Sequence, residues 1–111
     1  MHWTRVTLAA TDTPSDIKTL ASLTTKYRNI VRIVIYAEDG NNAGANGPAR
    51  VGASDVDRVV AGGVKGIPLF PGITDTTTFA AAGAAAGIYD FSKIYITGET
   101  GDVFQIGYVT L

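Results

Sequence analysis

The sequence predicts an all-β fold over residues 1–111: a single antiparallel β-sandwich or jelly-roll-like barrel with at most one or two short helical turns. Three observations support this prediction. Several segments alternate apolar and polar residues with a period of two, the clearest segment is rich in β-branched residues, and turns rich in glycine, proline and asparagine join them. Alternating strand and helix patterns, which would indicate a parallel sheet, are not seen.

The first strand is expected over residues 3–10. Val6 and Leu8 fall on one face of this segment, and Arg5 and Thr7 fall on the other. Alternation of this kind is typical of a strand that buries one face and leaves the other in water. The segment is therefore predicted to be half buried.

The strongest strand signal lies in residues 30–37. This segment is rich in β-branched residues and is apolar on both faces apart from Arg32. Because β-branched side chains pack well on a pleated surface, the composition predicts a central strand that is covered on two sides.

A β-hairpin is expected near the C-terminus, with residues 91–97 and 101–110 as its two strands. Side chains alternate in character along both segments, and Gly98 and Gly101 bound the connection between them. Glycine supplies the positive φ that tight connections require, so this spacing favours a hairpin.

Two segments are candidates for helical turns. In the first, Thr13 offers an N-cap, Pro14 the first helical position and Asp16 an acid in the first turn. In the second, Ser54 and Asp57 have the spacing of a capping box, but two glycines soon follow. The apolar residues at helical spacing are Ile17, Leu20 and Ala21 in the first segment and Val56, Val59 and Val60 in the second. A helix, a loop and an edge strand stay open for the second segment.

The remaining stretches are expected as loops. Residues 39–48 and 80–87 are dominated by small residues and lack the bulk to build a core. Residues 67–73 place four large apolar side chains in a turn stiffened by two prolines. We expect Leu69 to plug one end of the sandwich, and Phe70 either to join it or to contact a partner.

Composition excludes several classes of function. The formal net charge is −1 and the nine basic residues are scattered, whereas a nucleic-acid partner requires clustered lysine and arginine. The absence of cysteine excludes disulfides and thiolate metal sites. No apolar run approaches the length of about 18 residues that a membrane span requires, and no export signal is recognisable. We expect a soluble protein made in the cytoplasm, with neither nucleic acid nor membrane as a partner.

Catalytic chemistry finds no support in the sequence. The only histidine, His2, lies in a terminal segment where a surface role is the ordinary expectation, so a catalytic triad or a transition-metal site lacks its usual residues. The acids that could be paired, Asp12 with Asp16 and Asp55 with Asp57, are better explained as caps and turns. Residues 38–42 carry oxygen ligands of the kind that calcium takes but lack an EF-hand series. We therefore expect no catalytic residue, no metal site and no cofactor.

The aromatic residues allow two interpretations. A row of exposed rings would form a platform for sugars, as in a carbohydrate-binding module. Their positions within alternating segments favour core and cross-strand roles for most of them. The residues concerned are Trp3, Tyr27, Tyr36, Tyr89, Tyr95 and Tyr108.

Three segments together resemble a known class of protein. They are a Val-Gly strand within residues 50–56, a Gly-Ile-Pro-Leu-Phe-Pro-Gly turn at 66–72, and an Asp-Phe-Ser-Lys-Ile-Tyr segment within 89–96. Their order is similar to that in small β-sandwich virion proteins of tailed bacteriophages, over the last two-thirds of the chain. The acidic loop at 38–42 and the alanine-rich stretch at 80–87 depart from that pattern.

The resemblance implies a non-enzymatic structural protein on the capsid exterior of a virion. Its expected role is that of a decoration (cement) protein, which binds the major capsid protein as a symmetric homo-oligomer, a trimer being preferred. A head-fibre or tail-associated module and a carbohydrate-binding β-sandwich are the alternatives, and a small enzyme has the least support. The residues expected to contact a partner are Trp3, Phe70, Asn41, Asn42 and Asn46.

Overall fold

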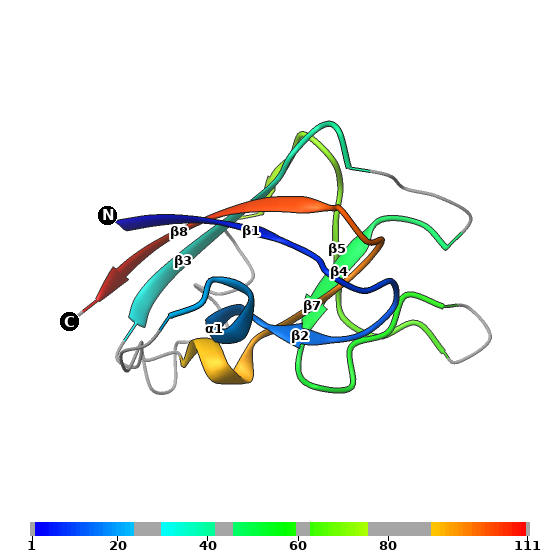
Figure 1. Ribbon diagram of the computed structural model, residues 1–111, viewed down its shortest axis with the longest axis horizontal. Coiled ribbons are helices and arrows are strands. Elements are labelled where there is room, and N and C mark those ends of the chain that lie inside the picture. The colour runs from blue at the N-terminus through cyan, green and yellow to red at the C-terminus, as the bar shows by residue number, and fades with distance from the viewer. Residues whose placement is uncertain (1, 24–29, 42–45, 60–62, 76–89, 111) are drawn as a thin grey trace.

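Two antiparallel sheets packed face to face make up the protein (Figure 1). The computed structural model describes residues 2–23, 30–41, 46–59, 63–75 and 90–110. Its strands are β1 (His2–Thr7), β2 (Ser15–Asp16), β3 (Ile30–Ala37), β4 (Ala49–Gly52), β5 (Ile67–Leu69), β6 (Thr74–Asp75), β7 (Tyr95–Thr97) and β8 (Val103–Thr110), with an α-helical turn α1 (Ile17–Leu20) and a 3-10 turn η3 (Phe91–Lys93). The sheet orders are β1-β8-β3-β6 and β2-β7-β4-β5. The predicted all-β sandwich is confirmed.

The first strand has the faces that the sequence predicted. Val6 and Leu8 are 1% exposed, whereas Arg5 and Thr7 lie on the solvent side. Strand β1 ends at Thr7, short of the expected residue 10, because the backbone turns away after Leu8 bonds to Asp102. Burial of alternate side chains is what fixes this edge strand onto its sheet.

Strand β3 is central in its sheet, between β8 and β6, and among the described residues its inner face is buried more fully than its outer face. Ile33 and Ile35 are buried in the core, while Arg32 on the opposite face is exposed and Tyr36 is half-buried. The expectation of a strand covered on two sides is only partly met in the described residues, because a two-layer sandwich covers mainly the inner face of each sheet. On the outer face Val34 is buried, at 9% exposed.

The predicted C-terminal hairpin is wrong. Strand β7 pairs with β2 and β4, and β8 pairs with β1 and β3, so the two segments lie in different sheets. The connection crosses the end of the sandwich instead, and Gly98 allows it to pass close to Leu8 and Ala49: a Cβ at this position would lie 2.9 Å from that of Ala49. Ile96 and Phe104 are therefore both buried in the core but belong to different sheets, which a hairpin within one sheet would not allow.

The two short helical turns differ from the sequence prediction. Helix α1 begins later than predicted, and η3 lies where a strand was expected. Asp16, not Thr13, caps α1, because its carboxylate accepts hydrogen bonds from the Thr19 backbone (3.0 Å) and hydroxyl (2.8 Å). Residues 91–97 were expected as one strand, but residues 91–93 form η3, which is capped by the Asp90 side chain. Asp16 also pairs with Tyr95 of β7, immediately before α1 begins.

The segment with the spacing of a capping box is a loop. Asp57 exchanges two backbone hydrogen bonds with Lys65, and its side chain accepts one from Val59. These bonds close the loop on itself, and Val56 is buried beneath it at 3% exposed. Of the alternatives left open for this segment, the loop is observed; Val60 lies outside the described residues.

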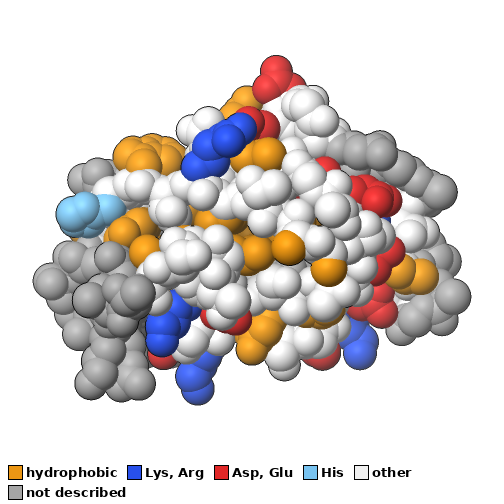
Figure 2. Space-filling view, in the orientation of Figure 1, with side chains coloured by type: hydrophobic (Ala, Val, Ile, Leu, Met, Phe, Trp, Pro, Cys, Tyr) orange, Lys and Arg blue, Asp and Glu red, His pale blue; other side chains and the backbone are white. Residues whose placement is uncertain are grey.

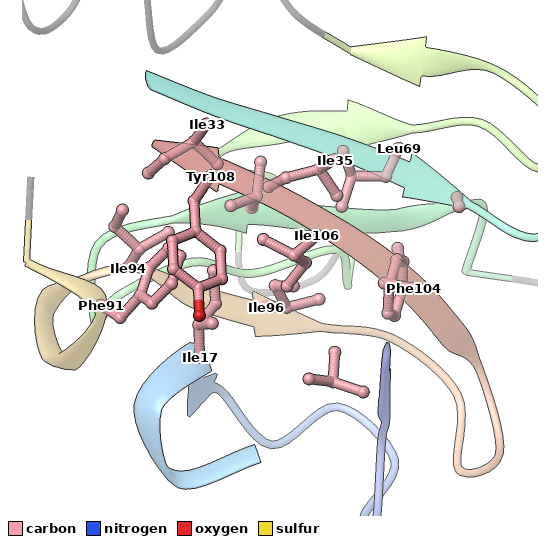
Figure 3. Packing of buried hydrophobic residues seen from close by; sticks show 14 of the residues in the cluster. Ile17, Ile33, Ile35, Leu69, Phe91, Ile94, Ile96, Phe104, Ile106 and Tyr108 are labelled. Carbon is pink, nitrogen blue, oxygen red and sulfur yellow. The ribbon is translucent and has the colours of Figure 1, made fainter. Parts of the chain in front are cut away.

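The core lies between the two sheets and extends to η3 at one end (Figure 3). Phe91 and Tyr108 meet edge to face, with ring centroids 5.1 Å apart. Leu69 is 2% exposed, so its expected burial is confirmed, although it lies on strand β5 rather than in a turn at one end of the sandwich. The larger side chains of this cluster are Ile17, Ile33, Ile35, Leu69, Phe91, Ile94, Ile96, Phe104, Ile106 and Tyr108.

Candidate partner-binding surface

Trp3 is exposed on the outer face of the β1-β8-β3-β6 sheet. Its relative exposure is 58%, and its neighbour in the register, Gly107, carries no side chain that could cover it. Beyond Gly107 in the same row lies Val34. A large ring is thus held on a hydrogen-bonded strand in open solvent, where a partner could cover it.

A second exposed apolar group lies in the turn between β5 and β6. Phe70 is 50% exposed and Ile73 is 59% exposed, and the Ile73 backbone N–H donates to the Phe70 carbonyl at 3.1 Å. Pro71 and Gly72, with φ +79°, fill the two central positions of this type II turn. The turn is tied to the sheet by a 2.7 Å hydrogen bond from the Gly72 N–H to the Ala37 carbonyl.

These two groups do not form one patch. Trp3 belongs to β1 and Phe70 leads into β6, and β1 and β6 are the opposite edges of the same four-stranded sheet. With strands spaced about 4.8 Å apart, the edges lie roughly 14 Å from one another. A partner would therefore have to span the sheet, or two partners would have to bind separately.

The asparagines expected at the loop tip have bonds within the fold. The Asn41 side chain bonds to both backbone groups of Val103. Its Nδ2 donates to the Val103 carbonyl (2.9 Å), and its Oδ1 accepts from the Val103 N–H (2.7 Å). Asn46 donates to Asp12 at 3.3 Å. Asn42 lies outside the described residues. Contact between these asparagines and a partner stays a prediction.

Arg58 is the most unusual residue of the described structure, because its side chain is fully buried. Its guanidinium donates to Asp12 (2.5 Å), to Glu99 (2.7 Å) and to the backbone carbonyl of Gly47 (2.9 Å). Three loops and the segment after β4 are thereby joined at one end of the sandwich. The two carboxylates are about a quarter exposed, so they connect the buried charge to solvent.

The electrostatics of Arg58 favour a permanent charge. Burial by itself lowers the pKa of this guanidinium, but its hydrogen bonds to Asp12 and Glu99 and their negative charges outweigh burial and raise the pKa above the ordinary value of arginine. Arg58 acts in the described structure as a clamp for loops. A charge without counter-ions at this position would be costly.

This clamp was not predicted from the sequence. Asp12 was expected in a cap or turn, and its backbone does adopt a turn-like φ of +52°, but its carboxylate serves Arg58, 46 residues away. Asp16 does cap a helix. The only signal that could have indicated the clamp is that Arg58 is placed among three valines, at positions 56, 59 and 60, with Asp57 as its charged neighbour.

An ion pair crosses the outer face of the sheet near the Phe70 turn. Arg5 donates twice to Glu38, from Nε (2.8 Å) and from Nη2 (2.9 Å), and Gln105 donates to the same carboxylate at 3.3 Å. The hydrogen bond from Arg5 lowers the pKa of Glu38, followed by smaller contributions from Gln105 and the charge of Arg5, while partial desolvation opposes them. Nearby, desolvation and then the charge and hydrogen bond of Asp39 raise the pKa of Tyr36.

A lowered carboxyl pKa makes stability depend on pH in one direction. The Arg5–Glu38 pair stabilises the fold fully above the ordinary glutamate pKa of about 4.3, and this contribution is lost as the pH falls through the lowered folded-state pKa. We expect wild type to melt at a slightly higher temperature than Glu38→Gln at pH of about 7, and the difference to vanish at pH of about 2. Thermal melts of both proteins check this, and a difference that grows in acid would contradict it.

Other chemistry has little to build on within the described residues. No group of three or more His, Cys, Asp or Glu is placed there to hold a metal ion. In the acidic loop, Glu38 is engaged by Arg5 and Asn41 by Val103. His2 is exposed and lies 5.4 Å from the Tyr108 ring, as a surface histidine would.

The aromatic residues considered for a sugar platform differ in exposure, and Trp3 is the one exposed among those described. Tyr108 is buried, while Tyr36 and Tyr95 are half-buried. Tyr27 and Tyr89 lie outside the described residues.

On the face shown in Figure 2 the basic side chains are dispersed rather than gathered into a patch.

Comparisons with known proteins identify no relative. Neither models of protein families, nor curated proteins, nor solved structures match this chain. In the part of the chain that the structure describes, none of the helices is long and apolar enough to cross a membrane.

Proposed function

We propose that this protein is a non-enzymatic virion structural protein, a capsid decoration protein that binds and stabilises the lattice of the major capsid protein. The resemblance to small β-sandwich virion proteins of tailed bacteriophages motivates the proposal. The two-sheet fold is compatible with it. What the sandwich adds is a rigid support on which exposed apolar side chains are displayed.

The observation that carries the proposal is the exposure of large apolar side chains on hydrogen-bonded backbone. Phe70 and Ile73 flank a turn that is bonded to β3, and Trp3 belongs to a paired strand. Anchors that are ordered before binding lose little conformational entropy when a partner covers them. Aromatic anchors also contribute a large share of the energy of most interfaces.

Stabilisation of a shell requires only binding to the assembled state. A protein that binds the lattice more tightly than free subunits shifts the equilibrium toward the lattice. Contacts repeated by the symmetry of the shell add to one another even where each copy binds modestly. The function proposed here is therefore energetic, and no bond is made or broken.

Binding to capsids that lack the protein tests the proposal. We expect wild type to decorate such shells and to raise their melting temperature, and Phe70→Ala to weaken binding by at least about tenfold, as loss of an interface anchor does. Lys93→Ala, an exposed residue of η3, is the matched control and should bind as wild type does. The readouts are co-sedimentation with the shells and their thermal melting.

The proposal fails if decorated and bare shells melt at the same temperature and survive the same osmotic shock. Binding confined to fibres or tails would favour the head-fibre or tail-associated alternative instead. Measuring affinity for free capsid subunits completes the test, because a decoration protein should bind these subunits much more weakly than the assembled shell.

A carbohydrate-binding module is the second candidate, and exposed Trp3 is the observation that favours it. The ring lies on an open sheet face on which Arg5 and Gln105 offer polar groups. Aromatic stacking with a few polar neighbours is how flat surfaces of this kind hold ligands. A glycan array distinguishes the two functions: specific binding that is lost in Trp3→Ala would favour the module.

A further inference from the structure

Strand β1 is a long free edge. It has six residues, whereas the other edge strands described, β2, β5 and β6, have only two or three. Short edges leave few unpaired backbone groups, but a long edge is a template for pairing with another chain. In the described part of the molecule β1 has a neighbour, β8, on one side only (Figure 1).

The hydrogen bonds of the sheet show which residues of β1 face outward. The Leu8 N–H donates to the Asp102 carbonyl at 2.9 Å, so the backbone groups of Leu8 point toward β8. Because backbone groups alternate along an antiparallel ladder, those of residues 2, 4 and 6 also point toward β8. The N–H and C=O groups of Trp3, Arg5 and Thr7 are then directed to the open side.

A second copy of this chain could pair with that edge in few registers. Two identical antiparallel edges are related by a twofold axis, and the outward residues of one must face those of the other. An axis at Arg5 places two arginines opposite each other, which is repulsive. An axis at Trp3 leaves only a short overlap. An axis at Thr4 pairs Trp3 of each copy with Arg5 of the other.

The side chains favour the register centred on Thr4. Trp3 and Arg5 share the outer face of β1, so each ring would lie against a guanidinium of the partner copy. Two hydrogen bonds to Glu38 hold the guanidinium in place, and the Arg5 side chain is still 62% exposed. An aromatic ring on a guanidinium plane is a favourable cation–π contact, and the symmetry provides it twice.

The geometry points to self-association: we propose that two copies pair through their β1 edges, antiparallel and centred on Thr4, to form an eight-stranded sheet. This inference goes beyond the proposed function because it concerns the purified protein alone. A twofold dimer also differs from the trimer that the sequence led us to expect. Capsid binding through the Phe70 turn, which lies at the other edge of the sheet, can succeed or fail independently of it.

Cysteine cross-linking tests the register, and the chain has no cysteine of its own to interfere. Residues that face each other without sharing hydrogen bonds have Cα atoms about 4.5 Å apart, within the range of a disulfide. Thr4→Cys should therefore form a disulfide-linked dimer under mild oxidation. Thr7→Cys, exposed on the same strand, is the matched control and should stay monomeric on a non-reducing gel.

A charge series at Trp3 tests the same contact in solution by sedimentation equilibrium. Trp3→Ala should lower the association constant roughly tenfold, because both cation–π contacts are lost. Trp3→Lys should abolish dimers, since lysine would face the arginine of the partner copy, whereas Trp3→Glu should retain them. Circular dichroism of each variant verifies that the sandwich is intact.

Specific results would overturn the proposal. Wild type that stays monomeric at every concentration, or that forms trimers, rules out the twofold pair. Cross-linking of Arg5→Cys without cross-linking of Thr4→Cys rules out the register. Equal association constants for Trp3→Lys and Trp3→Glu would exclude the proposed contact with Arg5 of the partner copy. This result stands even if Thr4→Cys fails to fold.

Discussion

Neutralising both carboxylates beside Arg58, in an Asp12→Asn/Glu99→Gln double variant, is expected to lower the free energy of unfolding by about 3–5 kcal/mol. The Arg58 side chain has no exposure, so its charge would remain buried among neutral acceptors only, without a counter-ion. Asparagine at position 12 also tolerates the left-handed φ of +52°, which keeps backbone strain out of the comparison. Urea unfolding measures the loss.

The opposite substitution should cost less. Arg58→Met removes the buried charge and keeps much of the volume, and the carboxylates left behind are about a quarter exposed and can be hydrated. We expect a loss of about 1–3 kcal/mol, the value of hydrogen bonds to charged groups. Such a difference between the two losses is expected when the guanidinium of Arg58 is buried and the two carboxylates beside it are partly exposed.

A triple variant with Arg58→Met added to the two neutral substitutions separates charge from shape. It should be more stable than the double variant, because no buried charge remains without a partner. If the double variant unfolds within about 0.5 kcal/mol of wild type, the guanidinium reaches water and the clamp does not exist as described.

Phe91→Ala is expected to destabilise the protein by about 3–5 kcal/mol, the range for truncating a buried phenylalanine. The ring is fully buried and meets Tyr108 edge to face. Its removal leaves a cavity where η3 packs against α1 and the end of the core (Figure 3). The same change also ends the aromatic pair, which stabilises beyond the area that it buries.

Phe70→Ala is the matched control, because it deletes the same atoms from a half-exposed position. Its free energy of unfolding should stay within about 0.5 kcal/mol of wild type, as for most surface substitutions. Equal losses in the two variants would contradict the division between a core ring and a surface anchor. The result for Phe70→Ala also shows whether a loss of capsid binding in that variant reflects the interface rather than the fold.

The sequence by itself determined the elements whose signals are local. Alternation of Val6 and Leu8 with Arg5 and Thr7 identified the buried face of β1, and β-branched residues identified β3. The prolines and glycines of residues 66–72 indicated a turn, which is observed at residues 70–73, and Leu69 was correctly expected to be buried. These features depend on neighbours in the chain and on the simple partition of apolar side chains away from water.

Only some of the candidate contact residues could be predicted from the sequence. Trp3 and Phe70 were expected as anchors, and both are at least half exposed, although whether a partner covers them stays a prediction. Asn41 was expected as a loop-tip contact, yet its amide completes the ladder beside Val103. An amide has the same appearance in sequence whether it faces a partner or its own backbone.

Only the tertiary structure decided which strands are neighbours and where the buried charge lies. Residues 95–97 and 103–110 resemble a hairpin, but their apolar faces are buried by facing each other across the core, so they belong to different sheets. Arg58 meets Asp12 and Glu99 from 46 and 41 residues away. Such pairings follow from long-range packing, because a buried charge must find its counter-ions wherever the folded chain brings them.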